Sequence, residues 1–185
     1  MKTSLRIRAL LFISLGVIIV FKNYVIVIGQ TVRPAASAEA SSDDVELAIA
    51  TVNKLFAEMA ASNPAGIIGV HTPESQLVAL FKQKNGKSVV KTFDGDAFSK
   101  MFADKSKVMN ERMYAPEAKI FGDLAMVWGR YVFFANGKLT HCGVNSFHLV
   151  RTDAGWKIAG GSSTIDPGGC TDPEKAMKLT TVSEA

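Results

Sequence analysis

The 185-residue sequence is short of the residues and motifs on which metal, phosphate and serine chemistry depend. Its three histidines stand at positions 71, 141 and 148, and the last two fall on opposite faces of one expected strand, so no metal site is predicted. The glycine-rich stretch 160–164 lacks the lysine and the following helix of a phosphate loop. There is no Gly-x-Ser-x-Gly motif of a serine hydrolase, and no cofactor is indicated.

Cysteine is also scarce, with Cys142 and Cys170 as the only two. Two cysteines in an exported protein predict a disulfide, with two free thiols as the alternative. A bridge between positions that lie 28 residues apart would stabilise the fold by about 3–4 kcal/mol, because it restricts the unfolded chain. It would tie the C-terminal tail, residues 167–185, to the rest of the domain.

The amino terminus has the pattern of a targeting segment. Lys2, Arg6 and Arg8 precede an apolar run over 9–21, and Ala36-Ser37-Ala38 offers a cleavage site. We therefore expect residues 1–38 to be a signal peptide of an exported protein, periplasmic or secreted, followed by a spacer over 39–43. The alternative is an uncleaved anchor formed by residues 9–28, a stretch long enough to cross a bilayer.

Charge follows the same division. Residues 1–38 hold five of the 21 basic side chains and none of the 17 acidic ones, so a product that starts at Glu39 has a net charge of −1. Nothing then favours binding to nucleic acid, and contact with a membrane is expected only through an uncleaved N-terminal segment.

Periodicity predicts an α+β domain. Apolar residues recur at three- and four-residue steps from position 45 to position 59, behind N-cap candidates at 41–44. Further expected elements are a short helix over 64–70, strands over 76–83 and 87–92 joined by a type I′ turn at Asn85-Gly86, and a short helix capped by Asp94. An antiparallel meander then covers 108–120, 124–135, 139–152 and 156–164, with Pro116 marking a bulge or an edge.

This order of elements resembles the nuclear transport factor 2-like superfamily, which includes ketosteroid isomerase, polyketide cyclases and lumazine-binding-like bacterial proteins. Local matches fall at residues 55–59, 72–75, 122–127, 141–143 and 155–158. The resemblance covers residues 44–166 and implies a strongly curved, mainly antiparallel sheet that wraps around the N-terminal helix and leaves a conical pocket. No catalytic motif of a named enzyme is complete, and Asn63 stands where relatives often carry aspartate.

Strand alternation supplies candidates for that pocket. His141, Asn145 and Phe147 share one face of their strand with Gly143, and a histidine and an amide beside an aromatic ring make a plausible pocket wall. The simpler interpretation is that His141 only forms a hydrogen bond at the start of its strand. Further candidate ligand-binding residues on the preceding strand are Trp128, Arg130 and Tyr131.

Acid–base chemistry would need a carboxylate in an apolar pocket. Glu111 lies between Met109 and Met113 on one strand face, where burial would raise its pKa. Glu111 and His141 are therefore the catalytic candidates. Ordinary surface charge is the alternative for Glu111, and Arg130 is expected to pair with it in a structural ion pair.

Residues 124–134 are apolar on both faces, as in a strand that is covered on both sides. Helices cover only the concave face in this fold, so a homodimer formed through the sheet is expected. The resulting hypothesis is an exported domain that binds a small apolar molecule. The alternatives are an isomerase- or dehydratase-like enzyme that uses Glu111 or His141, and an assembly domain with a filled pocket.

Overall fold

The computed structural model describes residues 19–21, 24–26 and 41–175, in two units that divide after Ala36. In the first unit, β1 (Ile19–Phe21) and β2 (Tyr24–Ile26) pair antiparallel. Most of the expected signal peptide or anchor lies outside the described residues. Within the described ranges, no helix combines the length and apolar character needed to cross a bilayer.

The first described element of the second unit is α1 (Ser42–Ala60), which starts where the sequence predicts. The Ser41 hydroxyl accepts a hydrogen bond from the backbone N–H of Asp44 at 3.1 Å, and acidic residues occupy the first turn. The apolar stripe is buried, as expected for an amphipathic helix, at Ala48, Val52, Leu55, Phe56 and Met59.

Two short helices follow the same local rules. The side chain of Asn63 caps α2 (Pro64–Val70) by accepting from Gly66 N at 3.2 Å. Asp94 caps α3 (Gly95–Lys100) by accepting from Ala97 N at 2.7 Å, which confirms the predicted cap. Both caps satisfy N–H groups that a helix cannot satisfy itself.

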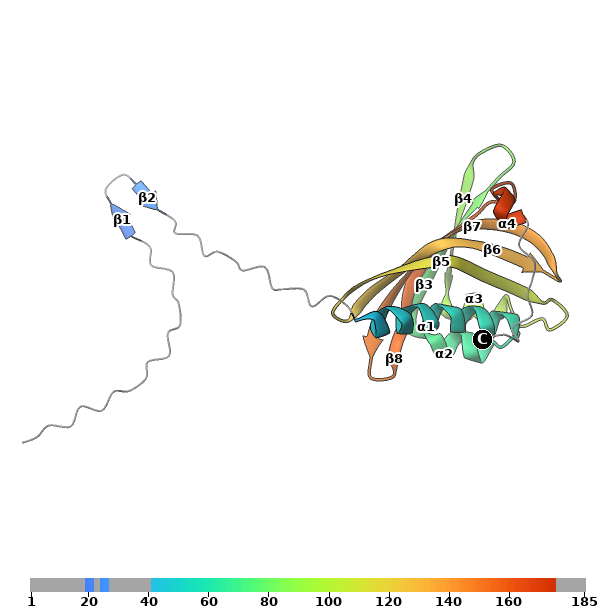
Figure 1. Cartoon of the computed structure of the whole chain (residues 1–185), viewed down its shortest axis with the longest axis horizontal. Coiled ribbons are helices and arrows are strands. Elements are labelled where there is room, and N and C mark those ends of the chain that lie inside the picture. The colour runs from blue at the N-terminus through green and yellow to red at the C-terminus, as the bar shows by residue number, and fades with distance from the viewer. Residues whose placement is uncertain (1–18, 22–23, 27–40, 176–185) are drawn as a thin grey trace, which may run out of the picture. The chain divides into compact units, whose positions relative to one another are not determined.

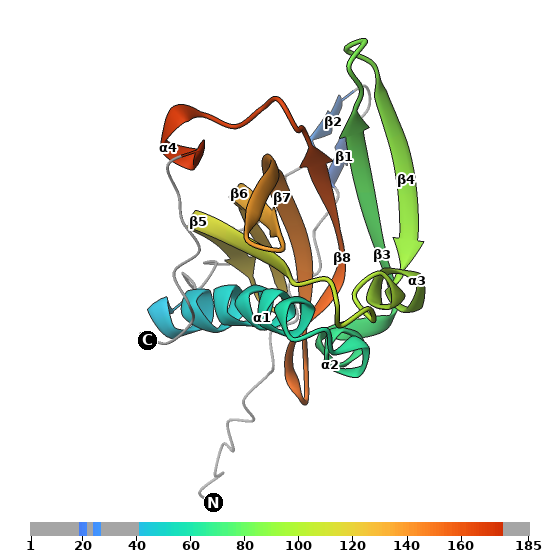
Figure 2. The same cartoon turned by 90° about the vertical axis from the view of Figure 1, so that its right-hand side faces the viewer.

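The six-stranded sheet has the order β4-β3-β8-β7-β6-β5, and only β3 and β8 pair in parallel. The strands are β3 (His71–Lys82), β4 (Ser88–Asp94), β5 (Met109–Phe121), β6 (Leu124–Ala135), β7 (Lys138–Thr152) and β8 (Gly155–Ile165). The predicted meander is confirmed as β5–β8. Figures 1 and 2 show the sheet arching over α1, so the domain is α+β with a curved sheet around its first long helix.

Two local predictions need correction. Asn85-Gly86 does not form a type I′ turn, because only Gly86 has a positive φ, of +81°. Gln83 N instead bonds to Lys87 O at 2.8 Å across a longer loop with a glycine in the left-handed region. β3 also starts five residues before the predicted position 76, with an irregular register between His71 and Gln76.

Pro116 lies at a bulge on an edge strand, as the sequence predicts. Ala115 has a φ of +47°, and the pairing of β5 with β6 shifts register between Tyr114 and Glu117. Proline has no N–H for a ladder bond, so it is tolerated where pairing is already broken and at the outer edge of the sheet.

The two faces of β6 meet different surroundings. On the concave face, Val127 and Tyr131 belong to the main core with α1. On the convex face, Val132 packs with Phe134 and Cys142 in a second small cluster that Cys170 of the C-terminal segment joins. The described part of this segment includes α4 (Asp172–Lys175) and covers part of the face for which only a partner was expected.

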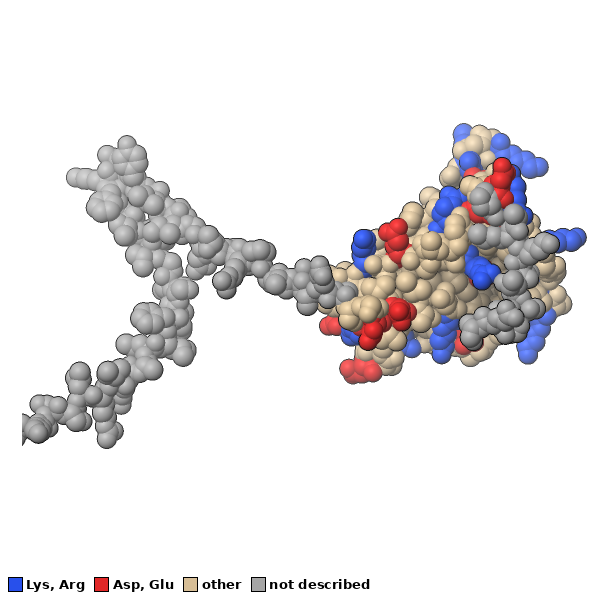
Figure 3. All heavy atoms as spheres, in the orientation of Figure 1, with Lys and Arg blue, Asp and Glu red and all other residues tan. Residues whose placement is uncertain are grey.

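Charges of both signs are scattered over the face of the second unit in Figure 3, with basic side chains at the β3–β4 hairpin. That hairpin carries Lys82, Lys84, Lys87 and Lys91.

Candidate functional site

A cavity of about 280 Å³ lies between the concave face of the sheet and the helices α1 and α3. Its wall takes residues from both helices and from all six strands, and most of them are apolar, including Leu55, Phe56, Met59, Phe102, Phe133 and Phe147. Four polar side chains line the wall as well: Glu111, Tyr131, His141 and Ser163. A largely apolar hollow with a few inward polar groups is the usual composition of a small-molecule site.

Strand register brings the polar groups together. Phe133 of β6 pairs with Glu111 of β5 on one side and with His141 of β7 on the other, so the three residues form a row across the concave face. Tyr131 lies two residues from Phe133 and therefore shares its face. Asn145 of β7 pairs with Ser163 of β8. The face of β7 proposed from the sequence is thus the concave one.

Glu111 projects into this mostly apolar space. It keeps some exposed surface as part of the cavity wall, although its carboxyl group is surrounded by protein. Burial raises the pKa of Glu111 to about 7, and a hydrogen bond from Asn145 lowers it only partly. Near neutral pH, Glu111 therefore exists as a mixture of acid and carboxylate, as a general acid or base requires.

A two-step hydrogen-bond chain holds the carboxyl group in place. Ser163 Oγ donates to Asn145 Oδ1 at 2.6 Å, and Asn145 Nδ2 donates to Glu111 Oε1 at 2.5 Å. Because an ionised carboxylate can only accept, Glu111 fixes which way the Asn145 amide points, with Nδ2 toward Glu111 and Oδ1 toward the Ser163 hydroxyl. Asn145 is fully buried and supports the cavity wall from behind.

His141 stacks on Phe133, with ring centroids 4.7 Å apart and an interplanar angle of 15°. Burial lowers the pKa of His141 to about 4, so the ring is neutral near pH 7. The Thr140 hydroxyl donates to Phe133 O at 3.1 Å and therefore accepts from His141 Nδ1, 2.9 Å away. The unprotonated nitrogen is then Nε2, and its low basicity makes it a weaker base than Glu111.

Tyr131 donates its hydroxyl hydrogen to Thr164 O at 2.8 Å. Burial and the nearby charge of Glu111 raise the pKa of Tyr131, so it remains a neutral phenol. Its ring meets that of His141 edge-on at 5.7 Å. Tyr131 thus helps to hold the aromatic wall in position.

The structure does not bring every predicted site residue into the cavity. Trp128 and Arg130 lie on the opposite face of β6, and neither lines the cavity. The expected ion pair between Arg130 and Glu111 is wrong, because the two side chains lie on different faces of the sheet. Arg130 instead pairs with Glu174 of α4 at 2.8 Å.

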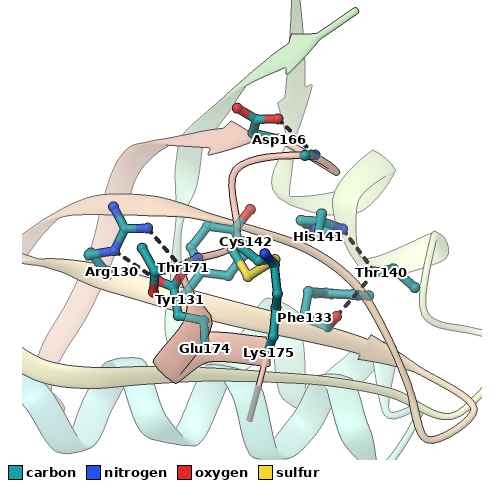
Figure 4. Close-up of a disulfide and its surroundings, with 12 residues drawn as sticks. Arg130, Tyr131, Phe133, Thr140, His141, Cys142, Asp166, Thr171, Glu174 and Lys175 are labelled. Atoms are coloured by element: carbon teal, nitrogen blue, oxygen red, sulfur yellow. Dashed lines mark hydrogen bonds and ion pairs between the residues drawn. A yellow bond between two sulfur atoms is a disulfide. The ribbon is translucent and has the colours of Figure 1, made fainter. Parts of the chain in front are cut away.

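The disulfide between Cys142 and Cys170 is present, as predicted from the sequence. Figure 4 shows it beside Arg130 and Glu174, where it joins the C-terminal segment to β7. Glu174 is fully buried and also accepts hydrogen bonds from Tyr114 and from Thr171 N. Burial raises the pKa of Glu174, but the hydrogen bonds from Arg130, Tyr114 and Thr171 outweigh this effect and bring it to about 2.

Sequence reasoning missed Ser163 and Glu174. The pairing of Asn145 with Ser163 could have pointed to the first, once the register of β7 and β8 was known. No pattern in the sequence pointed to Glu174, because its partners Arg130 and Tyr114 lie 44 and 60 residues away in sequence. Across 41–175 and the short β1–β2 pair, no three histidine, cysteine or acidic side chains cluster in a way that could hold a metal ion.

Comparison with solved structures defines the fold. A nuclear transport factor 2-like superfamily protein from Salmonella enterica matches with a TM-score of 0.55 and 14% identity, over 72% of this chain and 98% of that one. A protein of unknown function with a cystatin-like fold from Nostoc punctiforme matches with a TM-score of 0.55 and 9% identity, over 70% and 96%. The domain has a nuclear transport factor 2-like fold.

A candidate dehydratase of the nuclear transport factor 2-like family from Streptomyces avermitilis also matches, with a TM-score of 0.53 and 14% identity over 67% of this chain and 96% of that one. No protein-family model and no curated protein matches the sequence. At these identities the likeness extends to the fold, which hosts many functions.

Proposed function

We propose that this domain binds a small, largely apolar molecule in the cavity between α1, α3 and the concave face of the sheet. The observation that carries the proposal is the cavity itself. Its volume of about 280 Å³ is roughly twice the ~150 Å³ of an engineered apolar cavity that binds benzene. Burying apolar ligand surface there would supply the driving force, at about 25 cal/mol per Å².

Methionine methyl groups offer a direct test. Met59, Met101 and Met109 line the cavity, whereas Met126 is exposed on the convex face and serves as an internal control. We expect indole, added to protein labelled with ¹³C at the methionine methyl groups, to shift the signals of the three lining residues and not that of Met126. Lining signals that stay unchanged up to millimolar indole would contradict binding.

The second candidate function is acid–base catalysis, favoured by a carboxyl group with a pKa of about 7 in an apolar wall. In an isomerisation, Glu111 would remove a proton from the carbon next to a carbonyl group and return it to another carbon of the same molecule. In a dehydration, it would give that proton to the departing hydroxyl group, which leaves as water while a C=C bond forms. We expect the domain to speed deuterium uptake by 2-tetralone in D₂O, monitored by proton NMR. A rate equal to that of Glu111→Gln protein would count against catalysis.

The third candidate function is that of an assembly domain whose pocket is filled by its own side chains. The cavity volume favours the two small-molecule functions over it. Binding has the broader support of the two, because it depends on the whole cavity. Acid–base catalysis depends on Glu111 alone, the one group in the described wall with a pKa suited to proton transfer near pH 7.

We also propose that the protein is exported. The disulfide between Cys142 and Cys170 supports this, since such bonds persist in oxidising compartments. Cell fractionation followed by N-terminal sequencing would test it, with Glu39 as the expected first residue of the mature chain. A chain that begins at Met1 in the membrane fraction would instead favour the anchor.

A further inference from the structure

The charges around the cavity limit what it can hold. Among the described residues that line it there is no lysine or arginine, and Glu111 is the one carboxyl group. The residues contributed by α1 and α3 are all apolar. The other titratable groups in the wall, Tyr131 of β6 and His141 of β7, are neutral near pH 7. An anionic ligand would therefore find no countercharge.

The two oxygens of Glu111 have different surroundings. Oε1 accepts from Asn145 Nδ2, which donates from behind the wall. Oε2 makes no hydrogen bond to any residue that the structure describes. When Glu111 is protonated, Oε1 is already occupied as an acceptor, so the proton belongs on Oε2. Oε2 is then the group through which Glu111 can donate to a ligand.

The shape of the wall points to a flat ligand. The stacked rings of Phe133 and His141 form an aromatic surface beside Glu111, and Tyr131 meets His141 edge-on. Aromatic walls of this kind favour planar ligands through offset stacking and edge contacts. Scaled from the benzene-sized cavity, about 280 Å³ accommodates roughly eleven non-hydrogen atoms, close to a fused two-ring compound with one small substituent.

From this geometry we propose that the cavity selects uncharged, planar, two-ring molecules that present a hydrogen-bond acceptor such as a carbonyl oxygen to Glu111 Oε2. The proposal rests on the proposed function, since it names the class of molecule that the same cavity binds. A carboxylate ligand is rejected because its own charge would be buried with no cation to offset it, and above pH 7 the ionised Glu111 would add a second negative charge beside it.

Three probes of nearly equal size separate the contributions: 2-acetylnaphthalene, 2-naphthoate, and 2-isopropenylnaphthalene, in which a C=CH₂ group replaces the carbonyl. Binding is followed by the methyl signals of Met59, Met101 and Met109 at pH 6. We expect 2-acetylnaphthalene to bind roughly three- to tenfold more tightly than 2-isopropenylnaphthalene, the net value of one hydrogen bond. We expect 2-naphthoate to bind at least ~100-fold more weakly than the ketone, because a buried unpaired charge is costly.

Two substitutions test the role of Oε2. Glu111→Gln keeps an acceptor for Asn145 and places an N–H₂ donor where Oε2 stands, so it should keep the preference for the ketone at every pH. Glu111→Met keeps the length of the side chain without a donor, so the preference should disappear. In the unsubstituted protein, the preference for the ketone should fall by roughly that same three- to tenfold as the pH rises past 7, because the donor is lost.

The outcomes distinguish this proposal from the broader one. If none of the three probes shifts the lining methionines, the proposed function itself fails. If 2-isopropenylnaphthalene binds but 2-naphthoate binds within threefold of the ketone, the cavity is a binding site and the selectivity proposed here is wrong. A preference for the ketone that survives in Glu111→Met, or tighter binding of cationic 2-naphthylmethylamine, would also overturn it.

Discussion

Replacement of Glu111 by glutamine should make the protein more stable, and more so as the pH rises. In the unfolded chain the carboxyl group ionises near its ordinary pKa of 4.5, whereas burial raises the pKa of Glu111 to about 7 in the folded protein. A carboxyl group with a raised pKa lowers stability as pH rises from 4.5 to 7, because the unfolded chain gives up its proton first.

The size of the effect follows from the shift. Each pKa unit is worth about 1.4 kcal/mol, so the shift of Glu111 from 4.5 to about 7 lowers the free energy of unfolding by about 3 kcal/mol at pH 8 and by less than about 1 kcal/mol at pH 5. Glutamine has no such ionisation, and its oxygen can still accept from Asn145. The gain from Glu111→Gln should therefore be about 3 kcal/mol at pH 8 and small at pH 5.

Urea denaturation followed by circular dichroism at both pH values measures this difference. Glu117→Gln is a matched control, because Glu117 is an exposed glutamate on the same strand. We expect that control to change the free energy of unfolding by less than about 0.5 kcal/mol at either pH. Equal effects of Glu111→Gln at pH 5 and pH 8, or a loss of stability at pH 8, would refute the account of a buried carboxyl group.

Three further predictions concern the convex face. Reducing the disulfide, or replacing both Cys142 and Cys170 by serine, should lower the free energy of unfolding by about 3–4 kcal/mol, measured in urea with and without reductant; an unchanged midpoint would contradict this. Glu174→Gln should destabilise the protein by about 2 kcal/mol at pH 7. Because the hydrogen bonds that hold the pKa of Glu174 near 2 outweigh its burial, this loss should shrink as pH falls from 4.5 toward 2, whereas a pH-independent loss would argue against it. Trp128, 42% exposed on this face, should lie in a homodimer interface, so Trp128→Arg should convert a dimer to a monomer by light scattering; a monomeric unsubstituted protein would contradict the dimer.

Much of the fold follows from local sequence signals. The cap residues Ser41, Asn63 and Asp94 each accept a backbone hydrogen bond at a helix start, and short turns specify the antiparallel meander. The parallel pairing of β3 with β8 is different, because it joins residues some 80 positions apart that share no turn. No short-range pattern determines such a contact.

The candidate site was also predictable only in part, because local alternation is visible in the sequence and long-range contacts are not. Alternation along β7 correctly grouped His141 with Asn145, and the apolar neighbours of Glu111 correctly suggested a raised pKa. Alternation along β6 places Arg130 and Tyr131 on opposite faces, so the sequence alone already shows that only one of them can face the cavity. What it could not supply was the face that is concave, or that Glu174 of the C-terminal segment would pair with Arg130.

The convex face shows how tertiary contacts alter a prediction from composition. The apolar residues of β6 indicated a covering partner, and the C-terminal segment of the same chain covers Val132 and Phe134. Met126 and Trp128, toward the other end of the strand, remain 37% and 42% exposed. The dimer prediction therefore rests on this shorter part of the strand alone.

Native mass spectrometry tests the central claim, small-molecule binding in the cavity, most directly. The protein is purified without denaturation from the cell fraction that contains it, and spectra are recorded with and without excess 2-acetylnaphthalene. Binding predicts a species heavier than the disulfide-bonded polypeptide, or than its dimer, by one small molecule per chain, either retained during purification or added as the ketone. The polypeptide mass alone in both spectra would contradict the claim.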